Sequence, residues 1–313
     1  MTALNNSDLF GITASEPTVR VNVYADEIQN KMCHHTGSEW HYIGLIVEDL
    51  AHPLLDDILK ERYCGVPDEL SPFYEKNNGI VHWSKLHSAN HKNICSRWFQ
   101  YILDPKRSGK TFYSYILGIN NTTLNHDEFG KADQFNSKYN RFFRTAILYA
   151  LKSFFPNQKI IIEHIYHETG QQEHNEYFPW HCIFRLKEEK NLIFKCREIE
   201  FLPKDHKKCL QSNLIQLCDC ILGVSSCILH GLEKSNSSHY REELARIYLP
   251  LFKRMIENPR NHKSQFQHSN RMMIRFFPKS KNSVDDPKRF SDQFYAKRTL
   301  YFEEQISGQL SFL

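Results

Sequence analysis

One carboxylate stands inside an apolar helical stretch, where a folded core would not be expected to place it. Asp219 lies in the run Leu-Ile-Gln-Leu-Cys-Asp-Cys-Ile-Leu-Gly of residues 214–223. A buried carboxylate is costly unless it is paired with a cation or bound to a metal. Gln216, Asp219 and Gly223 are spaced i, i+3 and i+7, so they share a helical face, and the glycine would let another group approach the backbone. This face is therefore a candidate site.

Further acids lie at or just beyond the ends of predicted strands. Asp26 and Glu27 close an alternating strand, Glu163 and Glu168 lie along or just after an Ile-Ile-Ile run, and Asp205 follows a third strand. Asp26 and Glu27 could instead begin a solvated loop, and Asp205 could be a helix-entry residue. If several converge on one sheet edge, their charges repel unless cations neutralise them, which is the electrostatic basis of a two-metal phosphoryl-transfer site. Such oxygen ligands favour Mg²⁺ or Mn²⁺.

The elements expected to position these acids form an α/β pattern. Alternating or β-branched stretches predict strands, and apolar residues at steps of three and four predict a long helix that Pro156 ends. The expected order is β-β-β-α-β-α-β-α, with a helical insertion over about residues 50–103 after the second strand. Strands are expected over residues 19–26, 40–47, 111–120, 159–167 and 197–202, and helices over residues 131–155, 177–188 and 209–232.

The composition is that of a globular protein whose basic residues are concentrated near the C-terminus. The 313 residues are 41% hydrophobic and 24% charged, with a net charge of +4, which excludes disorder as the main state. Without a signal peptide or an apolar run of about 18 residues, we expect a cytoplasmic protein. Residues 251–300 carry 12 Lys and Arg against 4 Asp and Glu, interleaved with aromatic rings. Nucleic acid is expected to bind there, through Arg271, Arg275, Lys279 and Lys281.

Four stretches resemble one known family. They are Tyr-Ala-Asp-Glu at 24–27, Phe-Pro-Trp-His at 178–181, Glu-Ile-Glu-Phe-Leu-Pro-Lys-Asp-His at 198–206 and, above all, the helical run at 213–223. Together they are similar to the domain of unknown function 3800 family, over roughly residues 19–230. That family resembles the ribonuclease H-like superfamily, whose three antiparallel strands, helix and alternating strands agree with the order above.

The resemblance implies a metal-dependent nuclease with a ribonuclease H-like mixed sheet. Asp26, Glu27 and Asp219 would be ligands, and Asp205 matches another acidic family position. On the fourth strand such folds usually carry an Asp, whereas this chain offers Glu168 or Glu163. We favour Glu168, at the strand end, and keep Glu163 as the alternative. The expected metal ligands are thus Asp26, Glu168 and Asp219, with Glu27 and Asp205 as further catalytic acids.

The implied chemistry is hydrolysis of a phosphodiester by a metal-activated water. Two Mg²⁺ or Mn²⁺ ions would stabilise the entering and leaving oxygens. His82 and His206 are candidate proton carriers, because a histidine near a scissile phosphate can protonate the leaving oxygen. Gln216 is a possible further site residue, because it shares a helical face with Asp219.

The chain is expected to have three segments. Residues 1–18 would be a flexible tail, residues 19–250 a ribonuclease H-like domain with the helical insertion, and residues 251–313 a basic, aromatic extension packed on the domain. Two other function classes stay open: a non-catalytic ribonuclease H-like module that binds nucleic acid or a partner protein, and a metal-dependent phosphatase acting on small substrates. The sequence does not distinguish DNA from RNA, endonuclease from exonuclease, or a monomer from a homodimer.

Overall fold

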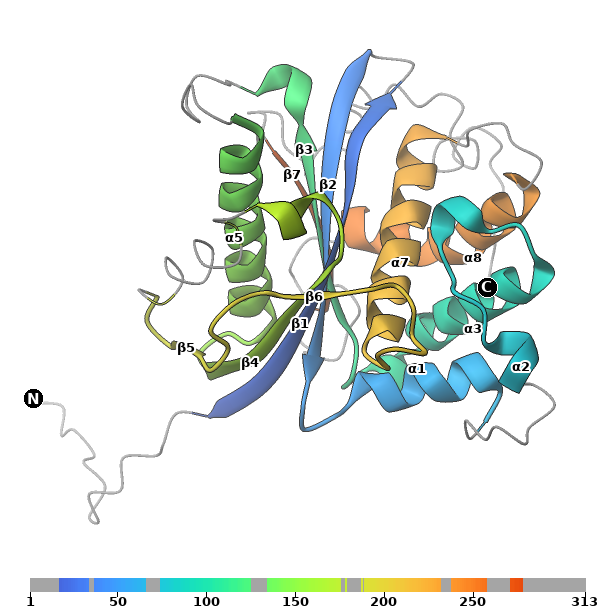
Figure 1. Ribbon diagram of the computed structural model, residues 1–313, viewed down its shortest axis with the longest axis horizontal. Helices are drawn as coiled ribbons and strands as arrows, with labels where there is room; N and C mark the ends of the chain where they lie inside the picture. Colours follow the sequence, from blue (N-terminus) through green and yellow to red (C-terminus); the bar gives the residue numbers. More distant parts are fainter. Residues whose placement is uncertain are drawn as a thin grey trace, which may run out of the picture.

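The computed structural model describes residues 17–33, 37–65, 74–124, 134–175, 178, 187, 189–231, 238–257 and 271–277. These residues form an α/β fold in which one mixed sheet separates two helical layers (Figure 1). Helix α5 (Gln134–Phe154) covers one face of the sheet, and α7 (Ser212–His230) covers the other. The two faces are buried in separate apolar cores, here called the α5 side and the α7 side.

Within the described residues the sheet has seven strands. They are β1 (Thr18–Cys33), β2 (Ser38–Asp49), β3 (Tyr113–Asn120), β4 (Lys159–Glu168), β5 (Leu192–Phe194), β6 (Glu200–Leu202) and β7 (Met272–Phe277). The order is β5-β4-β1-β2-β3-β7, and β6 also pairs with β4. β1, β2 and β3 are antiparallel neighbours, whereas β4 runs parallel to β1 and β7 parallel to β3. The ends of β1 and β4 therefore lie side by side.

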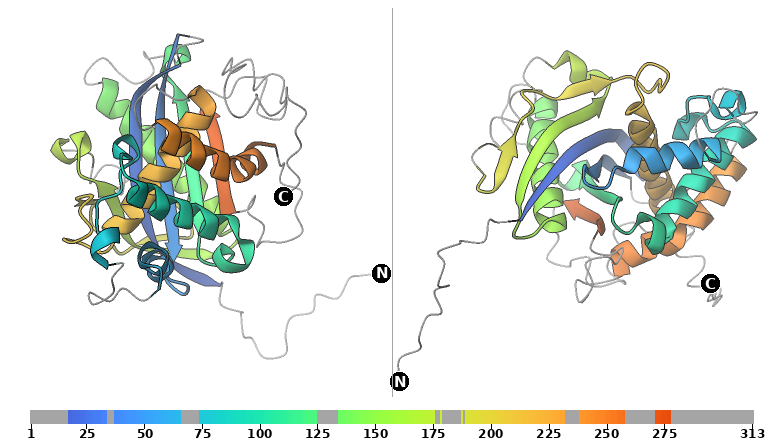
Figure 2. Two further views of the ribbon diagram at one scale, coloured as in Figure 1. Left: turned by 90° about the vertical axis from the view of Figure 1, so that its right-hand side faces the viewer. Right: turned by 90° about the horizontal axis from the view of Figure 1, so that it is seen from below.

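The helices of the α7 side come mainly from the segment between β2 and β3. They are α1 (Leu54–Tyr63), α2 (Tyr74–Asn77), the 3-10 turn η1 (Trp83–Lys85), α3 (Ala89–Leu103) and α4 (Pro105–Ser108), joined by α8 (Ser238–Glu257) after α7. Figure 2 shows α1, α3 and α8 on the outer side of α7. Two further 3-10 turns, η2 (Asn121–Thr123) and η4 (Gln171–His174), follow β3 and β4.

Helix α7 is buried all round. By length and composition it could cross a membrane, but all of its residues are buried inside this protein. The sheet covers one side, and α1, α3 and α8 cover the others. A helix enclosed in this way needs no polar face, so its apolar composition is explained by packing.

The period of two along β1 decides which side each acid faces. Val21, Val23 and Ala25 belong to the core of the α5 side, whereas Tyr24 belongs to the core of the α7 side. Because successive strand residues point to opposite faces, Asp26 projects toward α7 and Glu27 toward α5.

Most of the predicted elements are confirmed. The first four predicted strands are found as β1 to β4, the first two form the expected antiparallel pair, and the helices expected over 131–155 and 209–232 are α5 and α7. The helical insertion over about 50–103 is also present. The strand expected over 197–202 is found only as β6, and β5 was not predicted, because three residues are too few to show a period of two.

Some expectations differ from the structure or lie outside the described residues. The tail over 1–16 lies outside them, as does the helix expected over 177–188 apart from residues 178 and 187. The boundary expected between residues 250 and 251 falls inside α8, and β7 pairs with β3 within the sheet. Residues 272–277 are therefore part of the main fold and not of an added extension, since their hydrogen bonds are those of a sheet strand.

At Gly223 on α7 a side chain of the insertion approaches the helix backbone closely. A Cβ atom built on Gly223 would lie 2.0 Å from Cγ of the Trp83 ring. We expect Gly223→Ala to lower the free energy of unfolding by about 1–3 kcal/mol, because the cost of overpacking exceeds the gain in helix propensity. Urea unfolding measures this change. Ser225→Ala, at another buried α7 position whose hydroxyl has no hydrogen-bond partner among the described residues, is the control, and an equal loss in both variants would contradict the argument.

Candidate functional site

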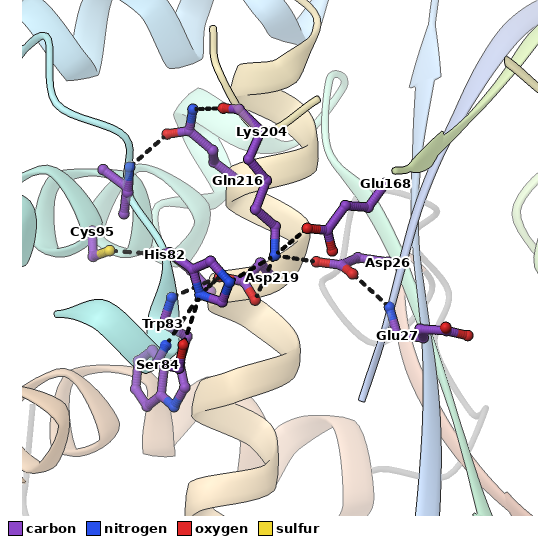
Figure 3. A network of polar contacts seen from close by, with 12 residues as sticks. Asp26, Glu27, His82, Trp83, Ser84, Cys95, Glu168, Lys204, Gln216 and Asp219 are labelled. Carbon is purple, nitrogen blue, oxygen red and sulfur yellow. Dashed lines mark hydrogen bonds and ion pairs between the residues drawn. The ribbon is translucent and has the colours of Figure 1, made fainter. Parts of the chain in front are cut away.

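Three predicted metal ligands converge on one cation, and that cation is a lysine. The Lys204 ammonium nitrogen lies 2.9 Å from Glu168 Oε1, 3.3 Å from Asp219 Oδ1 and 3.4 Å from Asp26 Oδ2. Figure 3 shows the four side chains meeting between the sheet and α7. The acids come from β1, β4 and α7, and Lys204 follows β6. We call these four residues the acid–lysine cluster.

The parallel pairing of β1 and β4 brings the first two acids together. Ala25 on β1 is opposite His167 on β4. The next residue on each strand is an acid, Asp26 on β1 and Glu168 on β4, so the two acids lie at the same end of the sheet. The pairing also contains an irregularity: Val21 pairs with Ile162 but Asn22 pairs with His164, which leaves Glu163 as an extra residue in β4. Such a bulge reverses the alternation of the residues beyond it.

The bulge decides between the two alternatives for the fourth strand. Ile162 and Ile165 both lie in the core of the α5 side, whereas Tyr166 lies in that of the α7 side. Glu168, two residues after Tyr166, therefore faces α7 and meets the cluster. Glu163 does not: its Oε1 accepts from Arg20 Nε at 2.7 Å and lies 3.1 Å from Lys195 Nζ.

The cluster combines strong charges with little solvent. Asp26 is 1% exposed, and burial raises the pKa of its carboxyl well above the usual range, with the Lys204 ammonium opposing this and the Asp219 and Glu168 charges adding to it. Burial by itself would lower the pKa of the Lys204 ammonium, but the charges of the three acids outweigh burial and raise this pKa. Lys204 therefore stays charged, which is what three neighbouring carboxylates require.

His82 is the partly exposed member of this neighbourhood. Its Nδ1 lies 3.3 Å from Asp219 Oδ2 and its Nε2 lies 3.2 Å from the Lys204 ammonium. Burial lowers the pKa of His82, the Asp219 charge opposes this and the Lys204 charge adds to it. The imidazole is therefore neutral near pH 7. The backbone N–H of the next residue, Trp83, donates to Asp219 Oδ2 at 2.6 Å.

The predicted face of α7 is used, although two of its three residues have structural roles. The side-chain amide of Gln216 donates to the Lys204 carbonyl at 2.6 Å, and its oxygen accepts from Val81 N at 2.9 Å and from the Arg62 guanidinium. Gln216 thus fixes the backbone of Lys204. The group that approaches Gly223 is the Trp83 ring. Only Asp219 belongs to the cluster itself.

Three other candidate residues lie outside the cluster. Asp205 accepts from the Lys207 N–H in its own turn at 3.1 Å, and α7 begins only at Ser212 with Gln211 as its N-cap, so Asp205 is not the helix-entry residue. The ring nitrogens of His206 are engaged by Asn78 Oδ1 at 2.7 Å and by the Gln216 amide. Burial lowers the pKa of His206 to about 4, so its imidazole is neutral near pH 7 and is held by these two side chains. Glu27 points to the other side of the sheet, as Figure 3 shows.

The expected nucleic-acid contacts are corrected in part. Arg271 is 1% exposed, and its guanidinium donates to the carbonyls of Ser108 and Phe112 at 2.6 and 3.2 Å. It therefore stabilises the start of β7 and is closed to a polyanion. Arg275 is half-buried and donates to the Ile274 carbonyl. Lys279 and Lys281 lie outside the described residues.

Lys204 is the residue that sequence reasoning missed. Its signal was visible, since a lysine follows Leu-Pro directly before Asp205 and close to the acidic helix motif. Nothing in the sequence, however, shows that a loop turns back to place this lysine among acids from three elements. The proximity of Trp83 to Asp219, over 136 positions of the chain, was equally hidden.

The donor set fits a divalent cation in its chemistry. Carboxylate oxygens are the ligands that Mg²⁺ and Mn²⁺ prefer, and Asp26, Glu168 and Asp219 already surround a positive charge. With the ammonium among them, no group of three or more His, Cys, Asp or Glu in the described residues is arranged as a metal-ligand set. A metal ion would therefore have to enter beside the ammonium or in its place.

Comparisons of the chain with protein-family models, curated proteins and solved structures find no match. The resemblance to the domain of unknown function 3800 family therefore stays a prediction from the sequence.

Glu27 gives a pH prediction on the α5 side. Burial is the main cause that raises its pKa from 4.5 to about 7. The folded state then keeps a proton that the unfolded chain releases near pH 4.5, so this group lowers stability as the pH rises from 4.5 to about 7. We expect Glu27→Gln to raise the free energy of unfolding by about 1–3 kcal/mol at about pH 8 and to change it little at about pH 4.

Urea unfolding of the parent and the variant at both pH values checks this. Glu198→Gln removes the same charge from an exposed position before β6 and controls for the change in net charge. An equal effect of Glu27→Gln at the two pH values would show that the carboxyl of Glu27 does not titrate in this range.

Proposed function

We propose that the protein is a divalent-metal-dependent nuclease with a ribonuclease H-like sheet. The main support is that Asp26, Glu168 and Asp219 converge on a single cation position. The strand arrangement supports the finer fold assignment. Three antiparallel strands are followed by a helix and by a strand parallel to the first, which is the arrangement that the resemblance implies.

In this proposal the residues of the chain bind the metal ion, hold the ligands in place and accept a proton. Asp26, Glu168 and Asp219 would hold the metal, and the Trp83 N–H and Gln216 keep Asp219 and Lys204 in place. Bound Mg²⁺ or Mn²⁺ would supply a Lewis acid for the phosphoryl oxygen and a more acidic water. Neutral His82, 27% exposed in its side chain, would accept a proton at the solvent side of the cluster.

Nucleic acid is the proposed substrate because of the charge distribution along the chain. The excess of Lys and Arg over residues 251–300 would bind the phosphate backbone. Since Arg271 is buried, this role falls to the other basic residues, among them Arg275, Lys279 and Lys281. Such binding would weaken steeply with salt concentration.

The test is cleavage of single- and double-stranded DNA and RNA with Mg²⁺ or Mn²⁺. We expect Asp26→Asn and Asp219→Asn to lower the cleavage rate by about 10²–10³-fold, because each removes a ligand worth several kcal/mol in the transition state. Glu163→Gln, at a β4 carboxylate paired with Arg20 and Lys195, is the matched control and should cleave like the parent. Intact substrates with all proteins, and no Mn²⁺ binding by calorimetry, would contradict the proposal.

A second candidate is a metal-free binding module, and one observation favours it. The Lys204 ammonium already neutralises part of the acidic charge at the position where a metal ion was expected. Such a module would bind nucleic acid equally well with a chelator present. Hydrolysis of small phosphate esters but not of nucleic acid would instead indicate a phosphatase.

A further inference from the structure

The Lys204 ammonium has the surroundings of a bound ion. Three carboxylate oxygens lie 2.9–3.4 Å from its nitrogen, and His82 Nε2 lies 3.2 Å away. The four neighbours come from β1, β4, α7 and the segment before η1. Only 11% of the Lys204 side chain is exposed, so the lysine is enclosed in the site.

Lys204 is also fixed at its backbone. Its carbonyl accepts from the Gln216 amide at 2.6 Å, and Gln216 is held in turn by Val81 N and by the Arg62 guanidinium. Arg62 and Gln216 are both fully buried. An ammonium on a backbone anchored in this way belongs to the site, so an entering ion has to share the acids with it.

The charges of the cluster set how much more positive charge it accepts. Carboxyl ligands of a metal ion are deprotonated, so a metal-bound cluster holds three ionised carboxylates. Together with the one ammonium they leave two negative charges, which one divalent ion neutralises. Two divalent ions would leave an excess of two positive charges in a largely desolvated site, which is costly. One divalent ion also needs few protein ligands, since Mg²⁺ is commonly held by one or two carboxylates together with waters and substrate oxygens.

We propose that this site takes one divalent metal ion and not two, and that the Lys204 ammonium serves as its second cation. The inference rests on the proposed metal dependence and sharpens it, because it replaces the expected two ions by one ion and a lysine. In this arrangement Lys204 balances the acids that a second metal would otherwise occupy.

The experiment counts Mn²⁺ ions bound per chain. Isothermal calorimetry with MnCl₂ gives the stoichiometry, and electron paramagnetic resonance of free Mn²⁺ gives an independent count. The full-length parent is compared with Lys204→Met, which removes the charge at similar length, and with Lys204→Arg, which keeps it. Lys208→Met, at an exposed position in the next turn, is the matched control.

We expect one Mn²⁺ per chain in the parent, in Lys204→Arg and in Lys208→Met, and two in Lys204→Met. Two ions in the parent, or one in Lys204→Met, would overturn the inference while leaving the proposed metal dependence intact. No Mn²⁺ in the parent but binding in Lys204→Met would overturn it in favour of a lysine that excludes metal. No binding in any of the proteins would refute the proposed function itself. If Lys204→Met does not fold, two ions in the parent or in Lys204→Arg still overturn the inference, and one ion in both supports it.

Discussion

The ammonium of Lys204 is the interaction on which the arrangement of the site depends. Asp26, Glu168 and Asp219 come from three different elements and would repel one another in a desolvated space. A positive charge at their centre turns this repulsion into attraction, and it ties the β6–α7 connection to the sheet and to α7. Because removing one partner of such a group leaves a buried charge uncompensated, the four residues hold their positions together.

Neighbouring acids of strand β1 face opposite sides of the sheet and lie in different polar environments. Asp26 faces the ammonium, whereas Glu27 faces the α5 side, where His41 lies 3.7 Å from its carboxylate. Burial dominates there: it raises the pKa of Glu27 to about 7 and lowers that of His41 to about 4. Both groups are thereby pushed toward their neutral forms. On the α7 side burial also raises the pKa of Asp26, but there the Lys204 ammonium opposes it.

The segment between β2 and β3 completes the site and is not a peripheral addition. Val81 N binds Gln216 and Trp83 N binds Asp219, so consecutive turns of α7 are each fixed by a backbone donor of this segment. The close approach of the Trp83 ring to Gly223 extends the same contact by another turn. His82, between these donors, is thereby directed at the cluster.

The sequence by itself determined the α/β class, the four central strands, the two long helices and the unusual position of Asp219, because period and polarity are local properties of the chain. It also indicated Asp26 and Glu168 as partners of Asp219. Only the tertiary structure decided that Glu163 occupies a bulge and Glu168 faces α7, that Arg271 is buried, and that a lysine stands where metal ions were expected. These outcomes depend on strand register and on loops that return over long sequence distances, and no local pattern encodes either.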